Sequence, residues 1–347
     1  MQQIIRRVCL AALLAAGFAS SANAQKALTW GEVRARFEAN NPTLFADKVS
    51  IDESKAQEIT AYLRPNPQLT VAADGTQIAP YKGVWAPFRG TYETPGVSYL
   101  HERQHKRELR LESAQKGTLI AESDHADLER NLLFSLRGAF VATLQAKAVL
   151  GLAKENLVYY DNVLDISRTR FSVGDIARID LDRLELQRVQ YESDVKSAEV
   201  NLRTAKIQLL TLLNDRTPIE QFNVAGLFDF NDQLMPQDEF RKIALDNRPD
   251  LKAAVEAVDK AQTDHKLAIA NGSTDPILSA WYTHNSSNNN PFGINTLGVS
   301  VSIPLRIFDR NQGEKLRTQL DIDRTGKLTS GAGPGVQRRR FGVCGCE

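Results

Sequence analysis

Apolar residues recur at helical spacing through the middle of the chain. No proline occurs between Gly96 and Thr217, and a proline in a helix interior would cost about 3 kcal/mol. Within this stretch one apolar face repeats at every fourth residue, at Leu128, Leu132, Leu136, Phe140 and Leu144. A second helical face runs from Leu184 to Leu213. The pattern predicts two very long helices, the first from about Glu102 to Thr169 and about 100 Å long.

One break separates the two predicted helices. The segment from Arg170 to Leu181 contains Gly174, which can supply the left-handed conformation that ends a helix. Asp175 or Asp180 can cap the helix that follows. The expected result is an antiparallel helical hairpin. A soluble coiled coil would show the same pattern, so the hairpin alone does not define a class of protein.

Strict alternation near the end of the chain predicts β-strands. Its apolar side comprises Leu297, Val299, Val301 and Ile303, and small residues lie between them: Gly298, Ser300 and Ser302. A partner strand is predicted at about 277–284, beyond a polar, asparagine-rich loop. An earlier pair is predicted at about 68–74 and 92–100. The expected fold class is therefore mainly α with β.

Four strands in an open sheet would leave exposed edges. An outer-membrane barrel shared by several chains would remove these edges, and it would give each strand a lipid-facing and a lumen-facing side. In this interpretation the four apolar residues from Leu297 to Ile303 face lipid.

The chain contains an internal duplication with a period of about two hundred residues, far longer than the period of a solenoid. Asn40-Asn41-Pro42-Thr43-Leu44 recurs as Asn247-Arg248-Pro249-Asp250-Leu251, and Gly96-Val97-Ser98 recurs as Gly298-Val299-Ser300. This similarity predicts a first repeat at 25–232 and a second, incomplete repeat at 233–324. A divergent Gly/Arg-rich tail follows at 325–347.

The first 24 residues have the pattern of a secretory signal peptide. Arg6 and Arg7 precede an apolar run, and a short segment rich in small residues follows the run and ends at Ala24, as at a signal-peptide cleavage site. The run is shorter than the roughly 17 residues that a membrane-spanning helix needs. We expect cleavage before Gln25 and export of the chain.

Composition excludes several other classes. Hydrophobic residues make up 42% of the chain and the formal net charge is +1, so nothing indicates a nucleic-acid surface. Cys344 and Cys346 do not form a disulfide framework. His101 and His105 have a spacing that can hold zinc on one helix face, but such a pair is more often a surface or packing feature. The sequence therefore predicts no metal site, no cofactor and no catalytic residue, and the chain is not expected to be an enzyme.

Three segments resemble the outer-membrane efflux proteins of the TolC family. The run from Ser302 to Glu314 is similar to a signature that follows the last strand in the branch serving cobalt-zinc-cadmium exporters of the RND type. The run from Glu102 to Arg107 resembles its counterpart after the second strand, and the run from Val173 to Leu181 resembles the family's helix-tip motif.

The resemblance implies a homotrimer in which each chain gives four strands to a twelve-stranded outer-membrane barrel. Long helices would form a periplasmic tunnel, with a helix from about Trp30 to Leu63 stacked end to end on the arm from Ile179 to Leu213. The implied partners are a periplasmic adaptor (membrane fusion) protein, an inner-membrane RND pump and outer-membrane lipid. The implied adaptor contacts are Arg170, Val173, Gly174, Asp175, Arg178, Asp180 and Leu181.

One departure from the family pattern concerns the second repeat. After its strands it has only a short helical start, at about 311–324, so the second hairpin is expected to be missing through truncation or a frameshift. The function implied is an exit duct for heavy-metal cations. The alternatives are a duct for drug efflux or type I secretion, a non-functional fragment, and a periplasmic coiled-coil scaffold.

Overall fold

The computed structural model describes residues 27–227, 235–285 and 294–332. The predicted signal peptide, the asparagine-rich loop and the two C-terminal cysteines lie outside the described residues. In chain order the described elements are α2 (Trp30–Asn40), α3 (Pro42–Tyr62), β1 (Gln68–Asp74), β2 (Tyr92–Leu100), α4 (Lys106–Ser172), α5 (Arg178–Leu212), η2 (Ile219–Gln221), α6 (Gln237–Asn247), α7 (Pro249–Asn271), β3 (Ile277–Asn285), β4 (Asn295–Ser302) and α8 (Gln312–Ala332).

Contacts divide the chain into two compact units. The first unit comprises residues 1–45 and 129–233, and the second comprises residues 46–128 and 234–347. The helices α3 and α4 each contribute residues to both. These units follow spatial contacts, not sequence similarity, so the predicted repeat boundaries stay a prediction.

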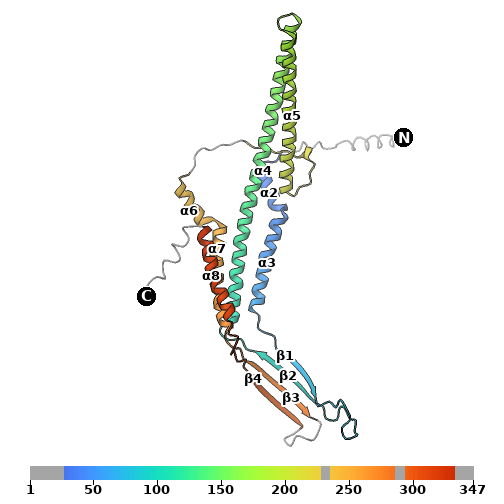
Figure 1. Cartoon of the computed structure of the whole chain (residues 1–347), viewed down its shortest axis with the longest axis vertical. Helices are drawn as coiled ribbons and strands as arrows, with labels where there is room; N and C mark the ends of the chain where they lie inside the picture. The colour runs from blue at the N-terminus through green and yellow to red at the C-terminus, as the bar shows by residue number, and fades with distance from the viewer. Residues whose placement is uncertain (1–26, 228–234, 286–293, 333–347) are drawn as a thin grey trace, which may run out of the picture. The chain divides into compact units, whose positions relative to one another are not determined.

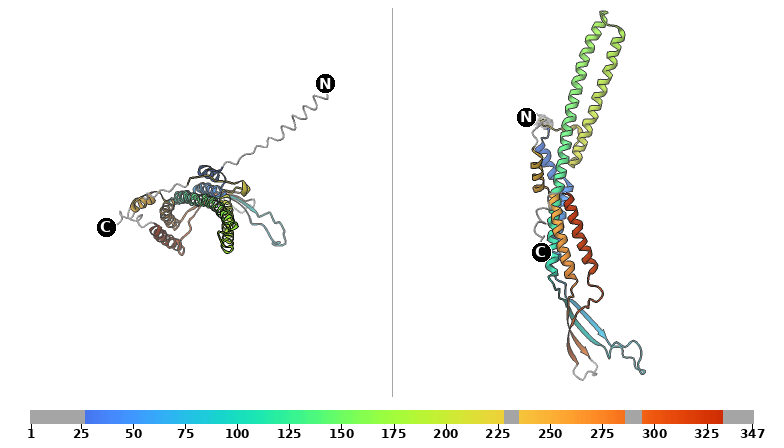
Figure 2. Two further views of the ribbon diagram at one scale, coloured as in Figure 1. Left: turned by 90° about the horizontal axis from the view of Figure 1, so that it is seen from above. Right: turned by 60° about the vertical axis from the view of Figure 1, so that its left-hand side comes forward.

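The first unit contains the predicted helical hairpin, and its two arms lie side by side in Figures 1 and 2. Its core is formed by apolar residues of α2, the first turn of α3, α4, α5 and the segments next to these helices: Leu28, Val33, Phe37, Leu44, Leu136, Phe140, Leu144, Leu209, Leu210, Leu213, Phe222 and Val224. Leu136, Phe140 and Leu144 belong to the predicted four-residue apolar repeat, which confirms that part of the pattern. A parallel bridge between Leu28 and Val224 fixes the chain next to this core.

The predicted helix from Trp30 to Leu63 is interrupted at Asn41. Its backbone is extended, with φ −75° and ψ 113°, and α3 begins at Pro42. The expectation of one continuous helix is wrong because proline disfavours the helical conformation of the residue before it. The start of α2 matches the chemistry of its sequence, since Thr29 and Glu32 form a reciprocal capping box.

The second unit contains a four-stranded antiparallel sheet in the order β1-β2-β3-β4. The strands predicted at 68–74 and 92–100 are confirmed at those bounds, and β3 and β4 begin or end within two residues of the predicted positions. Register partners place Val299 opposite Ala280, Ala280 opposite Val97, and Val97 opposite Leu69. Directly opposed residues share a face, so the register defines both faces of the sheet.

The helix α8 packs against α7 and continues to Ala332, well beyond the predicted end near Arg324. Thr325 and Thr329 are buried, and the Thr329 hydroxyl donates to the carbonyl oxygen of Ala254 on α7 at 3.0 Å. The expected end of the helix was wrong because packing against α7 outweighs the weak helix propensity of Gly326 and Gly331.

Candidate functional site: the hairpin tip and the apolar sheet face

The hairpin tip is a helix-ending turn that requires glycine. Gly174 has φ +79°. The N–H of Asp175 donates to the carbonyl of Arg170 at 2.9 Å, and the N–H of Gly174 donates to the carbonyl of Phe171 at 3.0 Å. This pair of hydrogen bonds is a Schellman motif with the left-handed residue at its expected position. The prediction that Gly174 supplies the left-handed residue that ends the helix is confirmed.

The predicted caps of α5 are wrong. The N-cap residue is Ala177, and no side chain caps it. Asp175 instead accepts a hydrogen bond from Nε of Arg170 at 2.7 Å, within an ion pair across the turn. Asp180 lies inside the first turn of α5, where its negative charge complements the helix dipole.

The tip presents apolar side chains among charged ones. Val173 and Ile179 are 76% and 61% exposed. Arg178 donates to Asp182 at 2.9 Å, and its guanidinium lies 5.7 Å from the centre of the Phe171 ring. Leu181 differs from the other predicted contact residues because it is only 5% exposed. The structure thus places six of the seven predicted residues on an accessible turn and gives Leu181 a packing position within the chain.

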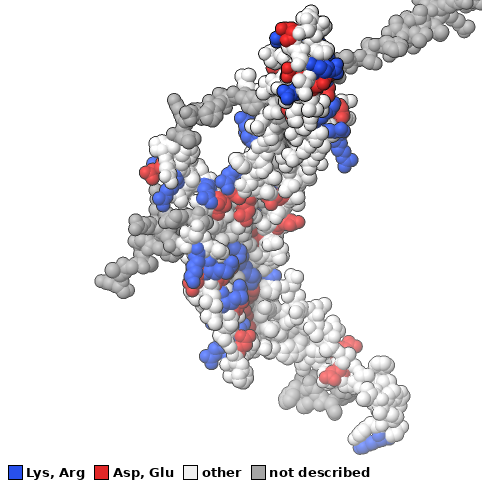
Figure 3. Space-filling view, turned by 45° about the horizontal axis from the view of Figure 1, so that its top comes forward, with Lys and Arg blue, Asp and Glu red and all other residues white. Residues whose placement is uncertain are grey.

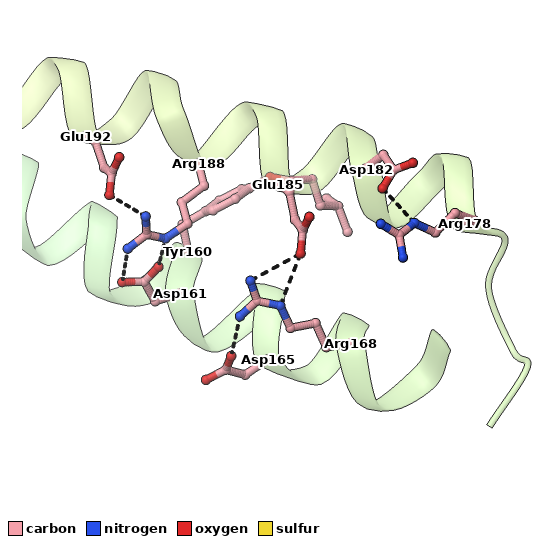
Figure 4. Close-up of polar contacts among 10 residues, drawn as sticks. Tyr160, Asp161, Asp165, Arg168, Arg178, Asp182, Glu185, Arg188 and Glu192 are labelled. Atoms are coloured by element: carbon pink, nitrogen blue, oxygen red, sulfur yellow. Dashed lines mark hydrogen bonds and ion pairs between the residues drawn. The ribbon is translucent and has the colours of Figure 1, made fainter. Parts of the chain in front are cut away.

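Ion pairs connect the two arms next to the tip (Figure 4). Arg168 of α4 donates to Glu185 of α5 and to Asp165 of its own helix. Arg188 of α5 donates to Asp161 of α4 and to Glu192. The hydrogen bonds that Arg188 donates, first to Asp161 and then to Glu192, raise the pKa of its guanidinium above the usual range.

An aromatic pair reinforces the same region. The Tyr160 hydroxyl donates to the carbonyl oxygen of Leu184 at 3.1 Å, and the rings of Tyr160 and Tyr191 have centroids 4.7 Å apart. Sequence reasoning missed these residues. The sequence does contain oppositely charged and aromatic residues on both arms. Which of them face each other depends on the register of the two helices, and the sequence alone does not give this register.

One face of the sheet is apolar over most of its length. From β1 to β4 its apolar part consists of Leu69, Val71, Pro95, Val97, Tyr99, Leu278, Ala280, Tyr282, Leu297, Val299 and Val301, and its end distant from the helices carries Ala73, Glu93, His284 and Asn295. Its apolar β4 residues are 62–78% exposed, and the next predicted residue, Ile303, is 54% exposed just beyond the strand. Few charged residues appear over the strands on the side seen in Figure 3. An exposed apolar surface this continuous requires a partner or lipid.

The opposite face carries mostly small and polar residues around one tryptophan. Trp281 lies opposite Gly96 on β2 and Gly298 on β4. A Cβ atom at Gly298 would overlap the indole ring, and one at Gly96 would lie 2.9 Å from the Trp281 Cβ. The two glycines of the duplicated Gly-Val-Ser motif therefore make room for the same side chain.

The His101 and His105 pair does not lie on a helix. Both residues precede Lys106, where α4 begins, and His105 has φ +55°. The helical spacing that suggested a zinc site therefore does not apply. Among the residues that the structure describes, no group of three or more His, Cys, Asp or Glu side chains could hold a metal ion.

Comparison with solved structures defines the fold. The chain matches CusC with a TM-score of 0.69 and 19% identity, over 87% of this chain and 72% of CusC. It matches the outer membrane channel CmeC of Campylobacter jejuni with a TM-score of 0.68 and 15% identity, over 86% and 67% of the two chains. The match to the outer membrane channel MtrE of Neisseria gonorrhoeae has a TM-score of 0.66 and 18% identity, over 87% and 69%.

The chain thus has the TolC-like fold of outer-membrane efflux channels. No protein-family model matches it. It is a distant homologue of the cobalt-zinc-cadmium resistance protein CzcC of Cupriavidus metallidurans, with 22% identity over 275 residues. That alignment covers 79% of this chain and 62% of CzcC, so the chain spans less than two thirds of this relative's length.

Proposed function

We propose that the chain is the outer-membrane exit duct of a tripartite RND efflux system. The observation that carries the proposal is the open sheet with one exposed apolar face, in a chain of TolC-like fold. A signal peptide at 1–24 would direct export. The apolar face would contact outer-membrane lipid, and three copies would close the sheet into a barrel.

The hairpin tip is the proposed contact with a periplasmic adaptor protein. Val173 and Ile179 offer apolar area, and the surrounding charges of Arg170, Asp175 and Arg178 offer polar specificity. A small apolar centre with a charged rim is the usual anatomy of a protein interface. The duct performs no chemistry, and the inner-membrane RND pump supplies the energy.

Heavy-metal cations are the proposed cargo. The support is the distant relationship to CzcC, whose name describes resistance to cobalt, zinc and cadmium. A duct for drugs or for secreted proteins would use the same fold, so the cargo must be tested directly.

The test is complementation in a bacterial strain that lacks its own outer-membrane duct. The chain is expressed with the adaptor and pump of a cobalt-zinc-cadmium system, and growth and retained metal are measured in Zn²⁺, Co²⁺ or Cd²⁺. We expect increased metal tolerance. A double variant, Val299→Arg with Val301→Arg, serves as the assembly-deficient control.

The outcomes separate the two parts of the proposal. Tolerance to drugs without tolerance to metals, measured with a drug pump, would reject the cargo and keep the duct. If the chain reaches the outer membrane in normal amounts but increases neither metal tolerance nor drug tolerance, the proposal that it is an exit duct is rejected.

A further inference from the structure

We propose that the pocket at the helix-proximal end of the sheet binds the headgroup of an anionic phospholipid. The inference rests on the proposed function, because it needs the apolar sheet face to lie in a bilayer. The pocket is lined by Arg64, Pro65, Tyr99 and the segment from His101 to Glu108. These residues follow α3, end β2 and begin α4.

Most of the acidic groups at this pocket already have basic partners. Glu102 accepts two hydrogen bonds from Arg110, the longer at 2.9 Å. Glu108 accepts from Arg107 at 3.0 Å. Lys106, which is buried, pairs with Asp275 at 2.6 Å. The charges of these side chains are therefore compensated locally.

Two arginines remain without a counter-charge. Within the described ranges, the guanidinium groups of Arg64 and Arg103 form no ion pair or hydrogen bond, and both residues are exposed. The backbone N–H of Arg103 donates to Asp275 at 2.9 Å, which fixes its position at the pocket. The pocket thus carries surplus positive charge, which favours an anion and disfavours a metal cation.

A neighbouring arginine holds the pocket wall in place. The guanidinium of Arg107 lies 4.3 Å from the centre of the Tyr62 ring, and the same group donates to Glu108. This stacking orders the first turn of α4 beside the two unpaired arginines.

Tyr99 connects the basic pocket to an apolar groove on the sheet. The groove is lined by Val97, Tyr99, Leu278, Ser279, Ala280, Val299, Ser300 and Val301, and Tyr99 also lines the basic pocket. A surface that is apolar along the strands and basic at their end matches a lipid with acyl chains and an anionic headgroup. A soluble phosphate would use only the basic part, so we assign the occupant to the membrane.

The experiment measures lipid retention by the purified full chain in detergent, using native mass spectrometry. Phosphatidylglycerol and phosphatidylcholine with identical acyl chains are compared. The pocket variant is Arg64→Gln with Arg103→Gln, and we expect its preference for phosphatidylglycerol to fall by about 30-fold. The matched control removes two cations at the other end of the same strands, Lys82→Gln with Arg89→Gln, and should keep the preference.

A second variant separates charge from folding. Arg64→Lys with Arg103→Lys keeps the positive charge and should retain most of the preference, while circular dichroism confirms equal helix content in all variants. Loss of preference in the lysine pair, or equal preference in the glutamine pair and the wild type, would overturn the proposal. Displacement of phosphatidylglycerol by soluble glycerol phosphate would also overturn it, because it would identify a free-phosphate site.

The failure of this inference differs from the failure of the proposed function. A chain recovered in the outer membrane without a preference for anionic lipid contradicts only the pocket. A chain that does not fractionate with membranes contradicts the duct itself.

Discussion

Asn41 follows the last residue of α2, and its side chain joins the start of α3 to the end of α5 in the first unit. Its side-chain oxygen accepts hydrogen bonds from the backbone N–H groups of Thr43 and Leu44, at 2.9 and 3.1 Å. Its amide group donates to the carbonyl oxygen of Leu212, at the C-terminal end of α5, at 3.4 Å. One buried side chain therefore satisfies free donors at the start of α3 and a free acceptor at the end of α5.

Replacing Asn41 with leucine should destabilise the chain by about 1–2 kcal/mol, because the backbone N–H of the buried Leu44 and the other two groups that pair with Asn41 would lose their partner. Asn41→Asp keeps the side-chain oxygen that accepts hydrogen bonds at the start of α3, so it should lower the stability less than Asn41→Leu does. Thermal unfolding followed by circular dichroism measures the effect. Asn40→Leu, at the adjacent exposed position, is the control, and an equal loss at both positions would contradict the assigned role.

The pair of Lys106 and Asp275 should make stability depend on pH. Burial alone would raise the pKa of Asp275, but the hydrogen bonds from Lys106 and from the backbone of Arg103 hold this pKa below its usual value. A carboxylate with a depressed folded-state pKa stabilises the fold above its unfolded pKa of about 3.9, and this contribution is lost as pH falls through the folded value.

Asp275→Asn should therefore lower the melting temperature at pH 7, and the difference from the wild type should shrink as pH falls below about 4. Melting temperatures measured from pH 7 to pH 3 test this expectation. Asp165→Asn, in an exposed ion pair with Arg168, should show little effect at any pH. A constant difference for Asp275→Asn across the range would contradict the assigned electrostatic origin.

At the scale of elements, the hairpin tip depends on one left-handed residue. Gly174→Val should strain the turn by about 1 kcal/mol or more, since β-branched residues disfavour positive φ. We expect weaker crosslinking from a cysteine at Asp175 to a co-expressed adaptor, with unchanged membrane insertion. Gly138→Val, in the interior of α4 with no neighbouring atoms within 4 Å of its Cβ position, is the control for helix propensity. Crosslinks that come only from the β1–β2 loop would reject the tip as the docking site.

The last strand should tolerate a charge on one face only. Val299→Arg and Val301→Arg place a cation on the apolar face and should each cost about 2–4 kcal/mol if that face lies in the bilayer. Ser300→Arg, on the opposite face of the same strand, is the matched control. Recovery of folded protein from the outer membrane measures the effect, and equal recovery of all three variants would contradict the assigned faces.

The sequence was most informative where local pattern and long-range packing agree. Period-two alternation identified β4, and Gly174 identified the hairpin turn, because each signal depends on residues close in the chain. Pro42 could have revealed the break at Asn41, since its effect on the preceding residue is local. The continuation of α8 could not be read in this way, because Thr325 and Thr329 are held by α7, a helix distant in sequence.

The candidate site was predicted less completely than the fold. Exposed tip residues could be named from a motif, but the burial of Leu181 follows from how the two arms pack. The ion pairs of Arg168 and Arg188 depend on which residues of α4 and α5 face each other. The basic pocket could not be predicted from the sequence for the same reason, because Arg64 and Arg103 line one pocket only in the folded chain.

At the scale of the whole molecule, the described sheet is open, with β1 and β4 as its two edge strands. Its strands alternate in direction, so the edge strands β1 and β4 run antiparallel to each other. Neither edge pairs with another strand in the described part of the chain. Copies of the chain can therefore continue the sheet without breaking its antiparallel pattern, and three copies would give the even strand number of a closed barrel.

We expect β4 of one copy to pair with β1 of the next. Cysteines at Thr70 and Ser300, both on the polar face, should form disulfides between copies after Cys9, Cys344 and Cys346 are changed to serine. Denaturing gels should show dimers and then trimers, with no larger species, because a closed barrel uses every edge. The matched control is Ser98→Cys with Ser279→Cys, which are register partners within one chain and should yield only monomers. A ladder extending beyond three copies would indicate open polymerisation through the exposed edges, and it would reject the closed trimer.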